Sequence, residues 1–97
     1  MGKPEAKVED YFIEQCAKRG ILETKFASPG RRGFPDRIAW GNGHTVLVEM
    51  KAINGRPSEL QKLRVKQINE HGGIAVFAYT REAIDEILDK YFPVRKE

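Results

Sequence analysis

Asp36 and Glu49 lie on either side of an Asn-Gly pair at positions 42 and 43. Apolar, β-favouring residues flank this pair, a pattern typical of a β-hairpin with a type I′ turn. If positions 42 and 43 form the centre of that turn, counting outward along both strands places Asp36 opposite Glu49. Directly opposed residues point to the same face, with Cβ atoms roughly 4.5–5.5 Å apart. The sequence therefore predicts two neighbouring carboxylates on one face of a hairpin.

Lys51 belongs to the same predicted face, because strand alternation returns the second residue after Glu49 to it. Two carboxylates at such close range repel each other unless a positive charge lies between them. Mg²⁺ takes oxygen ligands, usually one or two carboxylates with waters and substrate phosphate. We therefore expect a site for Mg²⁺ or Mn²⁺ and a water molecule at the open end of the hairpin, where the lysine can stabilise developing negative charge.

The residues just before Asp36 favour this interpretation. Pro35 rigidifies the entry to the strand, and Gly33 allows a close backbone approach just outside the site. The alternative interpretation of the same residues is an ordinary hairpin with an incidental salt bridge between Lys51 and one of the acids.

The composition is that of one globular domain, expected to span residues 1–97. Hydrophobic residues make up 40% of the chain and charged residues 32%, which suits a single modest core. No apolar run is long enough to span a bilayer, and the amino terminus lacks the apolar stretch of a signal peptide. The single cysteine, Cys16, cannot form an intrachain disulfide, so a reducing cytoplasm is the expected location and packing its expected role.

Positive residues cluster near the acids, although the net charge is only +3. A basic surround beside an acidic pocket suits a polyanionic substrate whose reacting group meets a metal ion. For each residue taken alone, an ordinary solvated surface is the alternative. The candidate phosphate-binding residues are Lys25, Arg31, Arg32, Arg56 and Lys62.

Three helices and two further strands must position this hairpin. Apolar residues at helical spacing and capping residues at the ends predict the helices, and apolar runs between turn signals predict the strands. Helices are expected at 5–18, 58–71 and 80–90, and strands at 21–27, within the hairpin 36–51, and at 74–79.

The resulting order, α-β-β-β-α-β-α, indicates an α/β fold. A crossover helix joins the third and fourth strands, so these two should be parallel, in a mixed sheet flanked by helices. The strand at 74–79 is a continuous apolar run, which we expect to be central in the sheet.

These residues resemble the signature of a known superfamily. The Pro-Asp pair at 35–36 and the Glu-Met-Lys run at 49–51 match the PD-(D/E)XK nuclease pattern, whose restriction-endonuclease-like core has the order αβββαβ. The Gly-Phe-Pro-Asp run at 33–36 and the Ser-x-x-Gln run at 58–61 further resemble the virus-type replication-repair nuclease (VRR-NUC) branch. The resemblance covers residues 9–87, nearly the whole chain.

The resemblance implies a metal-dependent nuclease that hydrolyses a phosphodiester bond of DNA through a metal-activated water. Asp36 and Glu49 would be the metal-binding carboxylates, and the backbone carbonyl of Met50 would be a further ligand. Lys51 would be the catalytic lysine.

Two more residues enter only through this resemblance. Gln61, in the first turn of the crossover helix, would match a glutamine that orients the lysine or the water. Glu9, on the first helix, would match an acid that completes the metal site. Nearby acids that could take its place are Glu5, Asp10 and Glu14.

Stand-alone members of this branch resemble Holliday-junction resolvases, which implies a homodimer acting on branched DNA in replication, repair or recombination. It also implies a phage origin, in a bacterial or phage-infected host cell. With no added recognition domain, backbone and shape recognition is expected over base reading. The alternatives are a catalytically silent DNA-binding module of the same fold and a nuclease subunit of a larger complex.

Overall fold

Seven elements form in the order expected from the sequence. The computed structural model describes residues 4–94, with side chains from residue 7 onward. The elements are α1 (Pro4–Lys18), β1 (Leu22–Lys25), β2 (Arg37–Gly41), β3 (His44–Met50), α2 (Glu59–Glu70), β4 (Ala75–Ala78) and α3 (Arg81–Tyr91). The predicted α/β class is confirmed, and no helix in the described part of the chain is long and apolar enough to cross a membrane.

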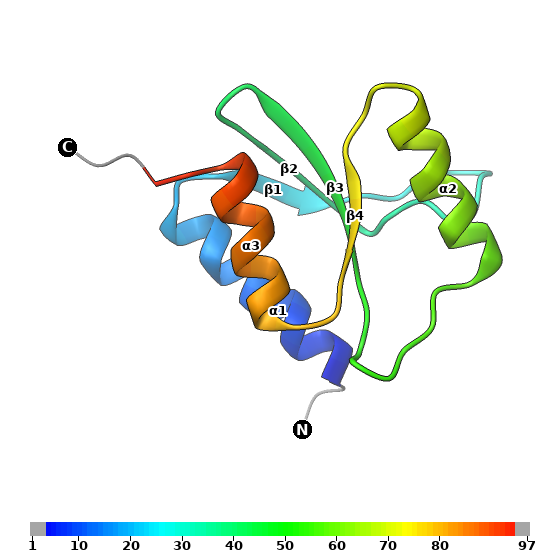
Figure 1. Ribbon diagram of the computed structural model, residues 1–97, viewed down its shortest axis with the longest axis horizontal. Helices are drawn as coiled ribbons and strands as arrows, with labels where there is room; N and C mark the ends of the chain where they lie inside the picture. The colour runs from blue at the N-terminus through cyan, green and yellow to red at the C-terminus, as the bar shows by residue number, and fades with distance from the viewer. Residues whose placement is uncertain (1–3, 95–97) are drawn as a thin grey trace.

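The four strands form one mixed sheet in the order β1-β2-β3-β4. The first three strands are antiparallel, and β3 and β4 run parallel with α2 as the crossover. The prediction that the last strand is central is wrong, because β4 lies at the edge. Its apolar composition has another cause: α2 and α3 both contact β4, and they lie on opposite faces of the sheet (Figure 1).

The β2–β3 hairpin has the turn and the register counted from the sequence. Asn42 and Gly43 both have positive φ, 49° and 78°, as a type I′ turn requires. Gly41 pairs with His44, and the ladder continues outward to the pair formed by positions 37 and 48. Residue 36 therefore lies just beyond the last pair, at the open end of the hairpin.

The core lies on the sheet face that α1 and α3 cover. Phe12 of α1 and Leu88 of α3 are fully buried against Val46 and Val48 of β3. Cys16 is buried in the same cluster, and this burial raises the pKa of its thiol to about 12, so its expected packing role is confirmed. Because this core holds one face of the hairpin, the residues alternating with it must point to the opposite face.

That opposite face is covered only in part. The crossover helix α2 lies over it and contacts β4, yet none of the residues of α2 is buried. Leu22 and Trp40, which pair across β1 and β2 on this face, stay 66% and 36% exposed. The sheet surface beside α2 is thus accessible, and the acidic end of the hairpin opens onto it.

Candidate active site

Glu49 is the one charged side chain buried in the described part of the chain, with 2% of its surface exposed. It lies near the end of β3, where Phe77 of β4 is its neighbour in the ladder. Lys51 Nζ lies 3.4 Å from Glu49 Oε2, and Gln61 Nε2 donates to the same oxygen at 3.4 Å. The structure therefore brings together the glutamate, lysine and glutamine named from the sequence.

Lys51 keeps the orientation of the strand although it follows the last residue of β3. Its backbone N–H donates to the carbonyl of Ala78 at 2.9 Å, which continues the pairing with β4. Strand alternation is thereby maintained, and the ammonium returns to the side of Glu49. The Lys51 side chain is only 16% exposed, so its contact with Glu49 is shielded from solvent.

Gln61 is held by a capping box at the start of α2. The hydroxyl of Ser58 accepts from the Gln61 backbone N–H at 3.0 Å, and Gln61 Oε1 accepts from the Ser58 backbone N–H at 2.9 Å. Because the amide oxygen is engaged at the helix terminus, the amide nitrogen is directed to Glu49. The Ser-x-x-Gln spacing thus caps the helix and aims a donor into the site at the same time.

Asp36 combines a fixed backbone with an exposed side chain. Its carbonyl accepts from the backbone N–H of Phe26 at 2.6 Å, and the preceding Pro35 is fully buried. The carboxylate itself is exposed to solvent. It lies close enough to Glu49 for its charge to raise the pKa of that residue, and it is the acid of the pair that a substrate can reach.

The surroundings of Glu49 disfavour the charged form of its carboxyl group. Burial and, secondly, the charge of Asp36 raise its pKa from 4.5 to about 6, while Lys51 opposes this increase. Oxygen Oε1 of Glu49 is buried without a hydrogen-bond partner. Buried polar atoms are rarely left unpaired, and such exceptions often mark an ion or a functional site.

The donor set at this position fits a divalent cation. Asp36, Glu49 and the Met50 carbonyl would supply hard oxygen ligands, and the unpartnered Glu49 Oε1 would gain a partner. Among the described residues, no group of three or more His, Cys, Asp or Glu side chains is placed to hold a metal ion. A cation here would rely on two carboxylates, a carbonyl, waters and substrate phosphate, which is the coordination that Mg²⁺ commonly accepts.

Glu9 does not join this group in the structure. Its carboxylate accepts from Arg37 Nε at 2.8 Å, and the Arg37 guanidinium also contacts Glu23 at 3.1 Å. Burial alone would lower the pKa of Arg37, but the hydrogen bond to Glu9 and the charges of both acids outweigh it, so this pKa is raised. Arg37 lies on the α1 side of the hairpin, away from Glu49. A metal-binding role for Glu9 stays a prediction, and it would require this ion pair to open.

The alternatives to Glu9 are not drawn into the site either. Asp10 is exposed, and Glu14 forms a surface pair with Lys18 at 3.0 Å. The side chain of Glu5 lies outside the described residues.

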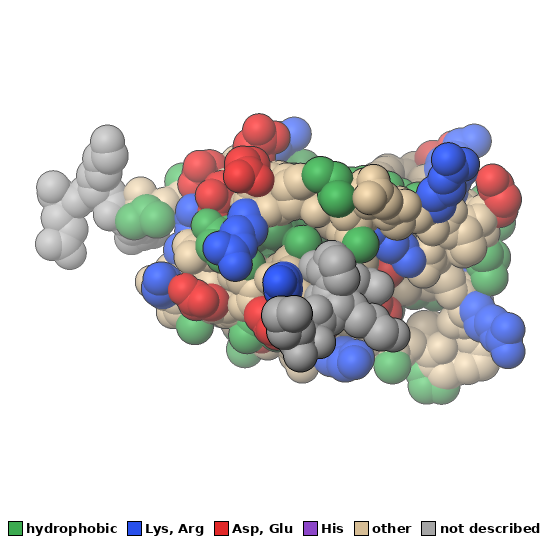
Figure 2. All heavy atoms as spheres, turned by 90° about the horizontal axis from the view of Figure 1, so that it is seen from below, with side chains coloured by type: hydrophobic (Ala, Val, Ile, Leu, Met, Phe, Trp, Pro, Cys, Tyr) green, Lys and Arg blue, Asp and Glu red, His purple; other side chains and the backbone are tan. Residues whose placement is uncertain are grey.

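The predicted phosphate-binding residues are all exposed. Figure 2 shows Lys and Arg side chains at the end of the molecule where α2 and the loop 26–36 lie. On α2, Lys62 pairs with Glu59 at 3.3 Å in a solvent-exposed contact. The others are Lys25 at the end of β1, Arg31 and Arg32 in the loop 26–36, and Arg56 in the segment before α2.

Arg64 of α2 is a residue whose role sequence reasoning missed. Its Nε donates to the Arg32 carbonyl at 2.9 Å, and its guanidinium lies 5.0 Å from the centre of the Phe34 ring. At Gly33, which has φ of 89°, a Cβ atom would lie 2.7 Å from Leu60 Cγ, so the loop is pressed against α2. One helix thus holds both Gln61 and the loop that leads into residue 36. The three-residue spacing from Gln61, which places both on one helix face, was the available signal.

Replacing Glu49 with glutamine will stabilise the metal-free protein at neutral pH. Because the pKa of Glu49 is raised to about 6 in the folded state, folding binds protons between pH 4.5 and 6, and stability falls as the pH rises through this interval. Above about pH 6 the full penalty, about 1–2 kcal/mol, is present. Thermal melts in EDTA should show E49Q more stable than wild type at pH 7.5 and equal to it at pH 4.

The exposed Glu59, with a side chain that is 93% exposed, gives the matched control for this experiment. E59Q should melt as wild type does at both pH values. A destabilised E49Q at pH 7.5 would show that the Glu49 carboxylate is well satisfied in the fold, and it would remove the argument that the unpartnered Glu49 Oε1 is a metal ligand.

Comparisons with known proteins agree with this architecture. No family model matches the chain. A solved structure described as "VRR_NUC domain" superposes with a TM-score of 0.84 at 24% identity, over 94% of this chain and 100% of that chain. A protein of Acyrthosiphon pisum secondary endosymbiont phage 1, named "Putative nuclease p44", is 41% identical over 58 residues. That alignment spans 59% of this chain and 62% of the phage protein. The chain therefore has the fold of a VRR-NUC domain.

Proposed function

We propose that this protein is a Mg²⁺- or Mn²⁺-dependent DNA endonuclease. The observation that carries the proposal is the buried Glu49 carboxylate, with one oxygen unpartnered and the other contacted by Lys51 and Gln61. The exposed Asp36 beside it and the surrounding basic surface add access and attraction for a phosphodiester. The VRR-NUC fold and the description of the phage relative as a nuclease support the same activity.

In this proposal each side chain has a separate task. Asp36, Glu49 and the Met50 carbonyl hold the metal ion, which when bound supplies Lewis acidity at the phosphate and activates water for hydrolysis. The Lys51 ammonium neutralises charge that develops on the phosphoryl oxygens or holds the attacking water. The Gln61 amide keeps the Glu49 carboxylate in place through its Nε2 contact. The products would carry 5′-phosphate and 3′-hydroxyl ends.

Branched DNA is the proposed substrate, recognised through its backbone and shape. The test is cleavage of a panel of Holliday-junction, flapped, single-stranded and linear DNA, each with Mg²⁺, with Mn²⁺ and with EDTA. We expect incision that requires the metal and is fastest on a branched member. Equal rates on all members would contradict structure selectivity, and no incision of any member would contradict the nuclease activity.

A catalytically silent DNA-binding module is the rival function. The convergence of Lys51 and Gln61 on a buried carboxylate argues against it, because a binding module gains nothing from acids that face phosphate. Metal-dependent nicking of a supercoiled plasmid separates the two. A second rival, a nuclease subunit of a larger complex, would show full activity only with partner proteins, which gel filtration and activity of the isolated chain would reveal.

Removing Arg31 and Arg32 together will weaken binding to every DNA substrate, including a continuous duplex. Both side chains are exposed in the loop that precedes the site. If each neutralises one phosphate, the double alanine variant should flatten the dependence of log K on log salt by about two units of slope. Anisotropy titrations in EDTA over a range of salt concentrations measure the slope.

Lys18 and Lys90, at the far ends of α1 and α3, give a control with the same loss of charge. Alanine at both positions should leave the salt slope at the wild-type value. An unchanged slope in the Arg31 and Arg32 variant would assign these arginines to the ordinary solvated surface.

We expect the protein to be a homodimer in solution, because paired incisions of a junction need two sites related by symmetry. Phe26 and Phe34, the contributors expected from the sequence, are half-buried. The exposed pair Leu22 and Trp40 is the larger apolar surface of the sheet, and it is the better candidate for a symmetric interface. Light scattering should give about 22 kDa, twice the chain mass of 11.1 kDa. A monomer mass that persists with junction DNA would contradict the resolvase-like model.

A further inference from the structure

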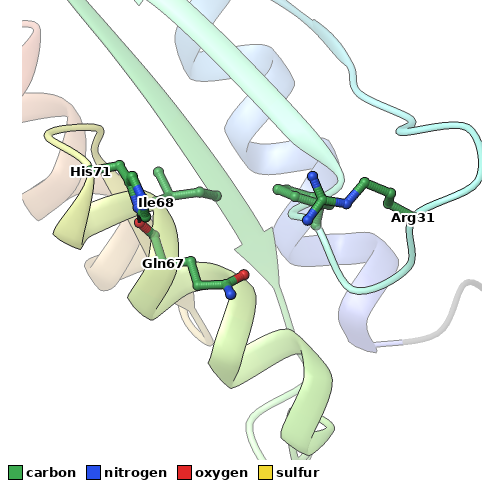
Figure 3. Close-up of a pocket in the computed structure, with 5 residues that line it drawn as sticks. Arg31, Gln67, Ile68 and His71 are labelled. Atoms are coloured by element: carbon green, nitrogen blue, oxygen red, sulfur yellow. Dashed lines mark hydrogen bonds between the residues drawn. The ribbon is translucent and has the colours of Figure 1, made fainter.

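A cleft of about 430 Å³ lies between the loop 26–36 and the carboxyl-terminal half of α2. In Figure 3, Arg31 reaches into it from the loop, and Gln67, Ile68 and His71 line it from the helix. Phe34 completes the lining. None of the lining residues is acidic and one is an arginine, so the cleft can accept a group that is attached to a negatively charged one, such as a phosphate.

The loop that lines one side of the cleft leads directly into the candidate active site. Phe34 is followed by the buried Pro35 and then by Asp36. The contacts of Arg64 with the Arg32 carbonyl and the Phe34 ring hold this loop to α2. A group bound in the cleft would therefore lie on the same face of the sheet as the candidate active site, farther along α2 from Gln61.

The lining offers flat and apolar contacts together with directed hydrogen-bonding groups. The Arg31 guanidinium lies 5.5 Å from the centre of the Phe34 ring, and Ile68 presents aliphatic surface. Gln67 Oε1 already accepts from Arg64 at 2.9 Å, so the Gln67 amide nitrogen is the part left to donate to a ligand. His71 Nδ1 lies 2.6 Å from the Gln67 carbonyl and must donate to it, which leaves Nε2 as an acceptor in the neutral ring.

A nucleobase matches these features, since it has two apolar faces for stacking and an edge of donors and acceptors, and it is attached to phosphates. Bases stack on aromatic rings and on guanidinium planes, and their edges are read by amide and imidazole groups. A base inside a duplex is unavailable, because its faces are stacked and its edge is paired. A base that is already unpaired enters such a pocket at the least energetic cost.

We propose that this cleft binds an unpaired base of the DNA substrate, on the α2 side of the protein where the candidate active site also lies. The inference rests on the proposed function, in that it takes DNA as the substrate. It supplies a physical source of selectivity for branched or distorted DNA: flaps and bulges present unpaired bases, and the pairs at the centre of a junction open at lower cost than those inside a continuous duplex.

The test measures binding without cleavage, by anisotropy in EDTA, with two duplexes that differ by one bulged nucleotide. The wild-type protein should bind the bulged duplex roughly tenfold more tightly, in line with the usual effect of one stacked base. With 2-aminopurine as the bulged nucleotide, its fluorescence should change on binding. The variant I68A/H71A should lose this preference and the fluorescence change, while its affinity for the continuous duplex stays at the wild-type value.

Leu63 gives the matched control, because it is an apolar residue of α2 that is 45% exposed and lies outside the cleft lining. L63A should keep the wild-type preference, and circular dichroism melts should show all variants folded. A second arm adds free dAMP as competitor, which carries the same kind of base without a strand.

Equal affinity of the wild-type protein for both duplexes would overturn the proposal, as would an unchanged preference in I68A/H71A. Displacement of the bulged DNA by micromolar dAMP would also overturn it, by assigning the cleft to free nucleotides. The nuclease activity is judged separately: a base preference without metal-dependent cleavage would contradict the proposed function alone.

Discussion

Replacing Asp36 with asparagine will abolish metal-dependent DNA cleavage while leaving the fold intact. The substitution keeps the shape of the side chain and removes a charge that the metal site needs. Because Asp36 is exposed, no buried contact is lost. Its charge also contributes to the raised pKa of Glu49, so the metal-free variant should be as stable as wild type or slightly more stable. Plasmid nicking with Mg²⁺ and Mn²⁺, together with thermal melts in EDTA, gives both readouts.

Asp10 provides the control for this experiment, since it is an exposed aspartate of α1 outside the proposed site. D10N should cleave as wild type does. Binding of Mn²⁺, followed by calorimetry without DNA, should be weakened in D36N and unchanged in D10N. Retained Mg²⁺-dependent cleavage by pure D36N would rule out the proposed site.

Replacing Lys51 with alanine will reduce turnover far more than DNA affinity. Its side chain is 16% exposed and its ammonium lies 3.4 Å from Glu49 Oε2, so under the proposed function we expect it to act at the reacting phosphate and to contribute little to general phosphate attraction. Positioned groups that stabilise transition-state charge contribute roughly 10²–10⁴-fold to rate. Single-turnover cleavage and anisotropy in EDTA measure the two effects separately.

The exposed Lys62 of α2 is the matched lysine for this comparison. K62A should lose a little affinity and cleave at the wild-type rate once DNA is saturating. If turnover and affinity of K51A fall together by a similar small factor, Lys51 is only a phosphate contact and the proposed task is wrong.

Local rules were sufficient for the hairpin and the order of elements. The turn at positions 42 and 43 and the register derived from it follow from the backbone preferences of two residues and a period of two. The sequence predicted Asp36 opposite Glu49, but the observed ladder ends at Arg37, one residue short of Asp36, which frees the carboxylate from the strand. The central position predicted for β4 was wrong. A continuous apolar run indicates only that both faces of a strand are buried. An edge strand that is covered by helices on both faces, as β4 is by α2 and α3, has the same apolar pattern as a central strand.

The sequence by itself determined which residue types are available and the face of the hairpin on which Asp36, Glu49 and Lys51 lie. The tertiary structure alone decided which residues from distant parts of the chain come into contact. The packing of α2 brings Gln61 to Glu49, and that of α1 pairs Glu9 with Arg37. It also decided the burial of Glu49, and with it the raised pKa and the unpartnered oxygen. These properties depend on how helices are placed against a sheet, which strand alternation and helix periodicity do not specify.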